Sequence, residues 1–282
     1  MSRIAYVNGD YVREEEAKIS IFDRAFLFAD AIYEVTAVLD GKLLDYESHL
    51  ERLHRSLREL GMTQPLSDAE LKEMQQQLIA RNSLNEGSVY IQITRGVAAR
   101  NFAYPENAGQ TIVGFTLVED FSGSPEAKKG IAIITIPDIR WQRRDIKTTG
   151  LLAQAMGKQA AAEAGAGDAW MVEQGYVTEG TASNAFIVLE GNRLVTRPLS
   201  NSILSGTTRR AILKLAERGE ISVEQRRFTV DEAKSASEAF LTSATHIAIP
   251  VVEIDGVMIG GGQPGPVTRK LRDMYFAMAR KA

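Results

Sequence analysis

The chain has 282 residues, of which 44% are hydrophobic and 24% are charged. These fractions are typical of a soluble globular protein with a sizeable core, and the length favours about two domains. There are 33 basic and 36 acidic side chains, so the formal net charge is −3, and the basic residues form no long block. We therefore do not expect a protein whose affinity depends on neutralising nucleic-acid phosphates.

The absence of cysteine and the scarcity of histidine exclude or disfavour several kinds of active site. With 0 cysteines, a disulfide scaffold, a thiolate-bound metal and a cysteine nucleophile are all excluded. The 3 histidines are scattered, so we expect neither a metal site nor a Ser–His–Asp triad. No apolar run approaches ~18 residues and the first residues do not resemble a signal peptide, so we expect a cytoplasmic protein without a membrane span.

Turn signals in the N-terminal half predict a mixture of antiparallel strands and helices. Asn8-Gly9 and Asp40-Gly41 lie between β-rich flanks and predict tight hairpins, since such turns demand positive φ. A leucine-periodic helix is expected to end at Gly61, and the capping-box sequence from Ser67 to Glu70 predicts the start of another. The strands expected in this half lie within 31–45, 88–96 and 110–120.

The run 121–126 (FSGSPE) is rich in turn residues and separates two β-rich segments. It predicts an interdomain linker between an N-terminal domain, 1–120, and a C-terminal domain, 127–282. The elements expected in the second domain are strands within 130–137, 169–180, 183–198, 239–245 and 250–259, and helices at 151–165, 207–218 and from Pro266. Gly191-Asn192 and Asp255-Gly256 predict two further hairpins, so the fold class is α+β with antiparallel-rich sheets, not a doubly wound parallel fold.

One charged segment contains a candidate nucleophile. Lys147 follows Arg143 and Arg144, shortly after a strongly apolar strand. Neighbouring positive charge and partial burial both disfavour the protonated form of a lysine, and a neutral amine is what Schiff-base chemistry needs. An ordinary solvated loop is the alternative, which this segment alone does not exclude.

Two further segments suggest an anion site and a partnered carboxylate. Gly206, Thr207 and Thr208 begin a predicted helix, whose first N–H groups and dipole attract phosphate, although an ordinary helix cap explains the same residues. Glu179 lies in a run of small hydroxyl and amide residues between two apolar strands. A carboxylate in that place needs a charged or hydrogen-bonded partner, unless it occupies an exposed turn.

Together, seven segments resemble the class IV aminotransferases, the fold-type IV enzymes that use pyridoxal 5′-phosphate (PLP). In chain order they are FDRAFLFADAIYEV (22–35), HLERL (49–53), TRGVAAR (94–100), RRDIKTTG (143–150), VTEGTASNAF (177–186), ILSGTTR (203–209) and LTSAT (241–245). The resemblance covers essentially the whole chain. It implies a two-domain fold with PLP at the domain interface, and a homodimer whose active-site loops cross between subunits.

The resemblance implies chemical roles for three of the matched residues. Lys147 matches the lysine that holds PLP as a Schiff base and then moves the proton as general base and acid. Glu179 matches the carboxylate that keeps the pyridine nitrogen protonated, so that the ring can act as an electron sink. Tyr33 matches a tyrosine on the substrate side. Lysine is therefore the expected catalytic group, and no metal is expected.

The cofactor phosphate is expected to bind to residues from three separate segments. Arg52 matches the arginine that contacts the phosphate, and Thr207 and Thr208 match the helix terminus that also binds it. Ser243 and Ala244 match a second backbone contact. Family members often have threonine where this chain has Ala244, so the hydroxyl is missing there and only the N–H remains.

Within the family, the overall likeness is greatest to the D-amino-acid aminotransferases. Arg100 matches the arginine that binds the α-carboxylate of the substrate in that group. The group typically has Arg-x-His in this loop, but here Phe102 replaces the histidine. The uncharged segment 35–38 also lacks a lysine that is typical of the group. Losing a charge-assisted hydrogen bond weakens carboxylate binding by roughly 1.5–3 kcal/mol, which favours donors such as (R)-1-arylethylamines; whether Phe102 faces the substrate stays open.

The expected function is transamination of D-amino acids such as D-alanine and D-glutamate, with pyruvate or 2-oxoglutarate as acceptor, extending to (R)-primary amines. The alternatives are an (R)-selective amine transaminase and a branched-chain L-amino-acid aminotransferase. A 4-amino-4-deoxychorismate lyase is disfavoured, because no motif specific to it occurs. A PLP-fold binding protein without turnover is the non-enzymatic alternative, and the presence of Lys147, Glu179 and Arg52 counts against it. The expected partners are small molecules, with no nucleic acid and no membrane.

Overall fold

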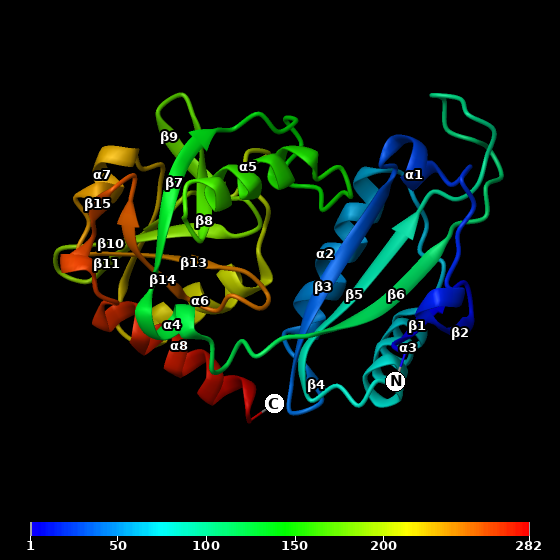
Figure 1. The fold of residues 1–282 in the computed structure, drawn as a ribbon, viewed down its shortest axis with the longest axis horizontal. Helices are drawn as coiled ribbons and strands as arrows, with labels where there is room; N and C mark the ends of the chain where they lie inside the picture. The colour runs from blue at the N-terminus through cyan, green and yellow to red at the C-terminus, as the bar shows by residue number, and fades with distance from the viewer. Residues whose placement is uncertain (1, 282) are drawn as a thin grey trace. The chain divides into compact units, whose positions relative to one another are not determined.

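In the computed structural model, which describes residues 2–281, the chain forms two compact units (Figure 1). Unit 1 contains the residues up to Asp120 together with Ile146–Gly150. Unit 2 contains Phe121–Asp145 and the residues from Leu151 onward. The segment around Lys147, expected from the sequence in the C-terminal domain, thus makes its contacts in unit 1.

Unit 1 is built on a six-stranded antiparallel sheet in the order β2-β1-β6-β5-β3-β4. Its strands are β1 (Ile4–Val7), β2 (Asp10–Arg13), β3 (Ala31–Leu39), β4 (Lys42–Leu43), β5 (Glu86–Thr94) and β6 (Ile112–Val118). Its helices are α1 (Arg24–Phe28), α2 (Tyr46–Glu59) and α3 (Asp68–Arg81), with a 3₁₀ turn, η1 (Glu14–Glu16). Leu53 and Leu57 of α2 and Leu71 and Leu78 of α3 share one apolar core with Ile146. Burial of these apolar faces holds both helices on the sheet.

Unit 2 is built on a mixed sheet in the order β12-β11-β10-β13-β14-β7-β8-β9, with β15 paired to β14. Its strands are β7 (Ile131–Pro137), β8 (Asp168–Glu173), β9 (Tyr176–Gly180), β10 (Asn184–Leu189), β11 (Arg193–Thr196), β12 (Ser222–Gln225), β13 (Glu238–Thr242), β14 (Ile249–Ile254) and β15 (Val257–Met258). Three pairs, β11/β12, β14/β7 and β7/β8, are parallel and the others are antiparallel. The expected α+β class with antiparallel-rich sheets is therefore confirmed.

The helices of unit 2 supply the crossovers that its parallel strands need. They are α4 (Pro125–Lys129), α5 (Leu152–Glu163), α6 (Thr207–Arg218), α7 (Val230–Lys234) and α8 (Pro266–Ala279), with a 3₁₀ turn, η2 (Gly260–Gly262). α5 joins β7 to β8 (Figure 1), and α6 lies between β11 and β12 in the chain. Across residues 2–281, every helix is too short or too polar to cross a membrane.

The tight turns expected from the sequence all occur. In each of the four predicted dipeptides both residues have positive φ, and each joins two paired strands. A fifth turn of this kind, Gln174-Gly175, joins β8 to β9 within the expected β segment 169–180. The segment expected as a linker includes the start of α4, where the Ser124 side chain accepts a hydrogen bond from the Ala127 N–H.

Candidate active site

Lys147 lies in a short extended segment beside the start of β3. The Tyr33 N–H donates to the Lys147 carbonyl at 3.0 Å, and an isolated bridge pairs Ile32 with Thr148. The Nζ atom of the half-buried Lys147 lies 4.0 Å from the centroid of the Tyr33 ring. Within the described part of the chain, Lys147 has no carboxylate at salt-bridge distance. Two predicted site residues are therefore adjacent, and the lysine amine is not consumed by an ion pair.

The two arginines that precede Lys147 are occupied by carboxylates. Arg143 contacts Asp145 at 3.0 Å, and Arg144 contacts Glu173 at 2.8 Å. Their positive charge is thus largely balanced by neighbouring negative charge. An influence of Arg143 and Arg144 on Lys147 therefore stays a prediction.

Arg52 is buried and held by a glutamate that was not singled out from the sequence. Its Nε and Nη2 atoms donate to the two oxygens of Glu34 at 2.8 and 2.7 Å, and His49 Nδ1 donates to the same carboxylate at 2.7 Å. Burial alone would raise the pKa of Glu34, but the charge and hydrogen bonds of Arg52, with those of His49, lower it to about 2. Burial lowers the pKa of His49, against the opposing effect of Glu34. The ionised Glu34 therefore fixes the orientation of the Arg52 fork.

Arg100 and Phe102 lie together in the long loop between β5 and β6. The guanidinium carbon of Arg100 lies 5.5 Å from the ring centroids of both Phe28 and Phe102, and the two rings are 5.4 Å apart. Arg100 is exposed and Phe102 is 77% exposed. In residues 2–281 no carboxylate forms a salt bridge with Arg100. The loop thus presents an unpaired guanidinium between two aromatic rings.

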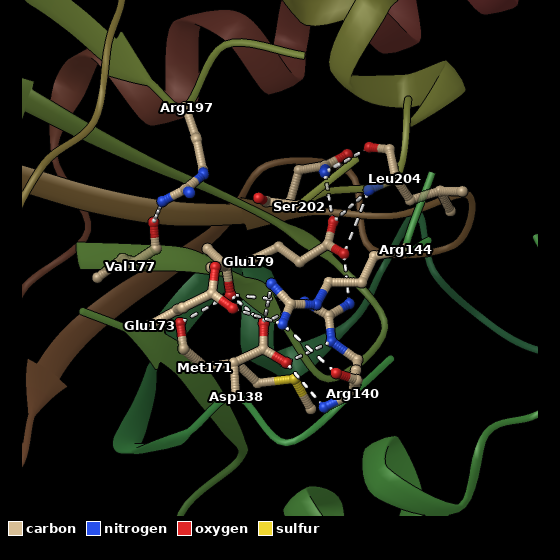
Figure 2. Close-up of polar contacts among 12 residues, drawn as sticks. Asp138, Arg140, Arg144, Met171, Glu173, Val177, Glu179, Arg197, Ser202 and Leu204 are labelled. Carbon is tan, nitrogen blue, oxygen red and sulfur yellow. Dashed lines mark hydrogen bonds and ion pairs between the residues drawn. The ribbon is translucent and has the colours of Figure 1, made fainter. Parts of the chain in front are cut away.

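Glu179 is a buried carboxylate at the end of β9 with three hydrogen-bond donors (Figure 2). Arg140 donates to it at 2.5 Å, Asn184 at 2.9 Å and the Leu204 N–H at 3.0 Å. Burial raises the pKa of Glu179, although the charge of Arg140 opposes the increase. The Leu204 N–H also lies 3.2 Å from the other carboxylate oxygen, so each oxygen of Glu179 accepts two hydrogen bonds.

Arg140 connects Glu179 to a second carboxylate, Asp138, as Figure 2 shows. The Nη2 atom of Arg140 lies 2.7 Å from Asp138, and Arg144 lies 3.3 Å from the same carboxylate. Burial alone would raise the pKa of Asp138, but the hydrogen bonds and charge of Arg140, followed by those of Thr178 and Arg144, lower it. Arg143 and Arg144 were singled out from the sequence but Arg140 was missed, because its partner lies 39 positions further along the chain.

Thr207 and Thr208 are buried in the first turn of α6, and their binding of an anion stays a prediction. A Cβ atom at Gly206 would lie 2.0 Å from Asn184 Oδ1, so only glycine lets the helix begin against this amide. The Nδ2 atom of Asn184 donates to the Leu204 carbonyl at 3.0 Å as well as to Glu179. Asn184 thus connects the buried carboxylate to the chain that leads into α6.

Ser243 and Ala244 lie in a tight turn after β13. The Ser243 N–H donates to the His246 carbonyl at 2.8 Å, and the His246 N–H donates to Ser243 Oγ at 3.2 Å. The Ser243 N–H is therefore already used inside the turn. A backbone contact to a phosphate at this place would have to come from Ala244.

Unit 2 also contains a cavity of about 530 Å³ on the α5 side of its sheet. Its lining includes Ser243, His246, Asp168 and Lys158, but neither Glu179 nor the threonines at the start of α6. Its polar lining groups are largely paired with one another, since Lys158 Nζ lies 3.5 Å from Asp168. The cavity therefore adds nothing to the predicted cofactor contacts beyond Ser243.

Comparisons with known proteins identify the family of this chain. The family model described as amino-transferase class IV matches residues 31–254. The chain is 37% identical over 265 residues to the D-alanine aminotransferase of Bacillus licheniformis, covering 94% of this chain and 93% of that protein. It is 38% identical over 271 residues to the D-alanine aminotransferase of Staphylococcus epidermidis, covering 96% of this chain and 95% of the relative.

Two solved structures share the fold. The Escherichia coli branched-chain amino acid aminotransferase superposes with a TM-score of 0.90 at 25% identity, over 99% of this chain and 95% of that chain. A second branched-chain amino acid aminotransferase, solved with pyridoxamine 5′-phosphate, gives a TM-score of 0.89 at 26% identity, over 100% of this chain and 96% of that chain.

The two-sheet α+β fold is that of a fold-type IV enzyme. The chain belongs to the class IV aminotransferases, and its cofactor is pyridoxal 5′-phosphate. The donor set of the structure fits that cofactor. Within residues 2–281 the Lys147 amine forms no ion pair, Glu179 is a buried carboxylate whose charge a protonated pyridine nitrogen would stabilise, and Gly206 precedes the 12-residue helix α6.

Proposed function

We propose that this aminotransferase moves the amino group of D-amino acids, such as D-alanine and D-glutamate, to pyruvate or 2-oxoglutarate. The observation that carries the proposal is the unpaired Arg100 guanidinium, exposed in the loop between β5 and β6. A guanidinium in this state is suited to the carboxylate of an amino donor. The identity of 37–38% with D-alanine aminotransferases over nearly the full chain supports the same substrate class.

PLP supplies a carbonyl group that binds amines covalently and a ring that accepts electrons when the donor Cα loses its proton. In the proposal, Lys147 binds the cofactor through Nζ and, once displaced by the donor, takes and returns that proton. Tyr33, whose ring lies 4.0 Å from Nζ, orients the amine. The negative charge of the buried Glu179 stabilises the protonated pyridine nitrogen.

The phosphate of the cofactor is proposed to bind to arginine and to a helix terminus. Arg52, oriented by Glu34, contributes charge, while Thr207 and Thr208 contribute N–H groups and hydroxyls. Ala244 adds a backbone N–H, and Ser243 adds its hydroxyl. These assignments predict that removal of any one of these phosphate contacts weakens cofactor binding without changing which amino donor is preferred.

A second candidate activity, the transamination of (R)-primary amines, is favoured by Phe102. An apolar ring beside Arg100 replaces the histidine expected there, so the loop has one charged donor fewer for a carboxylate. Branched-chain L-amino acids are a less favoured donor class, since the relatives with the higher identities are D-alanine aminotransferases.

We also propose that the protein is a homodimer. Large apolar side chains are exposed on two segments of unit 1, 19–28 and 97–104, which contact each other through the Ala98 N–H and the Phe22 carbonyl. The exposed residues are Ile19, Ile21, Phe22, Phe26, Val97, Phe102 and Tyr104. An apolar surface of this kind is typical of a protein interface.

Product analysis tests the proposed function. PLP-loaded protein is incubated with D-alanine and 2-oxoglutarate, and pyruvate and the enantiomers of glutamate are separated by chiral chromatography. We expect pyruvate and D-glutamate in equal amounts, and neither product from Lys147→Ala. Formation of no pyruvate by PLP-loaded wild-type protein, or wild-type turnover by Lys147→Ala, would overturn the proposal.

A further inference from the structure

A buried arginine, Arg24, holds the loop that contains Arg100 and Phe102. It is 3% exposed, and its Nη1 and Nη2 atoms donate to three consecutive carbonyls of the loop. The donor–acceptor distances are 2.6 Å to Asn101, 3.4 Å to Phe102 and 3.4 Å to Ala103. A planar guanidinium can span several carbonyls in one geometry, which a lysine ammonium cannot do.

The same loop is also fixed where it leaves β5. The Arg24 N–H donates to the Gly96 carbonyl at 2.9 Å, and the Ala98 N–H donates to the Phe22 carbonyl at 3.3 Å. At the other end of the loop, the Tyr104 ring lies 3.5 Å from the guanidinium carbon of Arg95. The backbone is therefore held before, within and after the residues that point outward.

Asp30 keeps the Arg24 side chain in place. Its Oδ2 atom accepts a hydrogen bond from Arg24 Nε at 2.7 Å and another from Arg95 Nε at 2.8 Å. One carboxylate thus faces two buried arginines. Arg95 directs its remaining hydrogen bond to the Leu60 carbonyl at 2.8 Å, away from the carbonyls of 101–103.

Arg100 itself lies beside the rings of Phe28 and Phe102. Because no ion pair within residues 2–281 fixes its guanidinium, its position follows from the conformation of the backbone beneath it. That conformation depends on the three carbonyl contacts of Arg24. A small displacement of a group that positions substrate can cost about a hundredfold in rate.

We propose that Arg24 is a positioning residue for the carboxylate of the amino donor. By holding the carbonyls of 101–103, it fixes Arg100 and Phe102 as a pair and sets the preference for donors with a carboxylate over donors without one. The inference rests on the proposed function, in which Arg100 binds that carboxylate.

The preference for a carboxylate is measured with two donors that differ only in that group. D-alanine and its neutral isostere D-alaninamide are each mixed with PLP-loaded protein, and the second-order rate constant is obtained from the change in cofactor absorption. We expect Arg24→Lys to lower the ratio of the two constants about tenfold, through a higher KM for D-alanine at nearly unchanged kcat. Arg95→Lys, the matched control on the same Asp30, keeps a positive charge for the Tyr104 ring and lacks any hydrogen bond to the carbonyls of 101–103, so it should leave the ratio within about twofold.

A double-mutant cycle separates the inference from the proposed function. Arg100→Ala should lower the ratio by about tenfold or more, and adding Arg24→Lys should lower it no further, because both changes act on one contact. An unchanged ratio in Arg100→Ala overturns the proposed role of Arg100. A lowered ratio in Arg100→Ala with an unchanged ratio in Arg24→Lys, or multiplicative effects in the double variant, overturns the role of Arg24 alone.

A surface variant and a measurement without substrate give independent evidence. Asn101→Gly removes the hydrogen bond from the Ala103 N–H to the Asn101 side chain at 3.1 Å and loosens the loop without touching the buried arginine. Like Arg24→Lys, it should lower the ratio of the rate constants for D-alanine and D-alaninamide. It serves as the test if Arg24→Lys does not fold. Hydrogen exchange of 97–104 should be faster in Arg24→Lys than in wild type or Arg95→Lys. Unchanged exchange together with an unchanged ratio in Asn101→Gly contradicts the inference.

Discussion

Two buried glutamates in this protein have pKa values shifted in opposite directions, although each has an arginine partner. Burial raises the pKa of both, but the Arg52 fork and His49 outweigh it at Glu34, whose pKa falls to about 2. At Glu179 burial prevails over Arg140, and the nearby Asp138 adds to the increase. Glu34 is thus satisfied by its partners, while the ionised form of Glu179 would gain from one more positive group, such as a protonated pyridine nitrogen.

Glu34 is expected to make the free energy of unfolding fall at acid pH. Because its pKa is lowered from 4.5 to about 2, its contribution is complete above about pH 4.5 and is lost as the pH falls toward 2. We expect the free energy of unfolding of wild type, minus that of Glu34→Gln, to fall by about 2 kcal/mol between about pH 5 and about pH 3. Urea denaturation at both pH values measures this difference, and a difference independent of pH would show that Glu34 is not held ionised by Arg52.

Glu179 is predicted to matter for turnover more than for folding. Glu179→Gln keeps the shape of the side chain but removes the charge that would stabilise a protonated pyridine nitrogen. We expect kcat for D-alanine to fall by at least about a hundredfold, with PLP still bound. The control is Glu173→Gln, which changes a partly exposed partner of Arg144, and it should keep kcat within about threefold of wild type. Equal effects of the two substitutions would refute the role of Glu179.

At the residue scale, the sequence indicated most groups with proposed chemistry but few of their partners. Lys147, Glu179 and Arg100 stand in motifs, so they could be identified from the chain alone. Glu34 and Arg140 were missed, because each acquires its role from a partner 18 and 39 positions away. A glutamate within the apolar strand 31–39 was the one available signal, since a buried carboxylate needs a partner.

At the scale of elements, local signals predicted turns and helix starts better than strand neighbours. Ser67 and Glu70 form the reciprocal capping box that their spacing indicates, and α6 spans the predicted 207–218. The parallel pairs of unit 2 were not predicted, because hairpin turns report only antiparallel neighbours. A helix between two strands, as α5 between β7 and β8, was the unused signal for a parallel crossover.

The start of α6 gives a test at the element scale. Gly206→Ala would place a Cβ atom 2.0 Å from Asn184 Oδ1 and displace the amide that donates to Glu179. We expect a loss of about 1–3 kcal/mol in the free energy of unfolding and PLP binding weakened about tenfold. Both are measured on purified protein, by urea denaturation and by PLP titration.

Gly109→Ala is the matched control for this substitution, because a Cβ atom there meets no heavy atom within 4 Å. It should change the free energy of unfolding by less than about 0.5 kcal/mol. If Gly206→Ala behaves in the same way, the contact between Asn184 and the start of α6 does not constrain the site.

At the scale of the whole molecule, the chain order did not predict which unit contains Lys147. Residues 146–150 follow a strand of unit 2 but pair with the start of β3 in unit 1. The placement of this segment in unit 1 depends on a long-range contact between Ile32 and Thr148, which no local sequence pattern predicts. Lys147, the proposed covalent group, and Glu179 therefore belong to different units, although each was singled out from its own motif.

The proposed homodimer predicts the effect of removing apolar surface. Phe22 and Phe26 are 53% and 70% exposed, and replacing both by serine should raise the dimer dissociation constant at least about tenfold. Analytical ultracentrifugation over a range of protein concentrations measures this change. Val118→Ser, at an exposed apolar residue of β6 outside both segments, is the control and should leave the constant unaltered. A wild-type protein that sediments as a monomer would contradict the proposal.

The choice among amino donors tests the proposed function most directly. PLP-loaded protein is mixed in single turnovers with D-alanine, L-leucine and (R)-1-phenylethylamine, without acceptor, and the visible absorption of the bound cofactor is followed. We predict that D-alanine changes this absorption at least about a hundredfold faster than L-leucine does, with (R)-1-phenylethylamine between them. A faster reaction with L-leucine than with D-alanine would contradict the D-amino-acid specificity that Arg100 is proposed to provide.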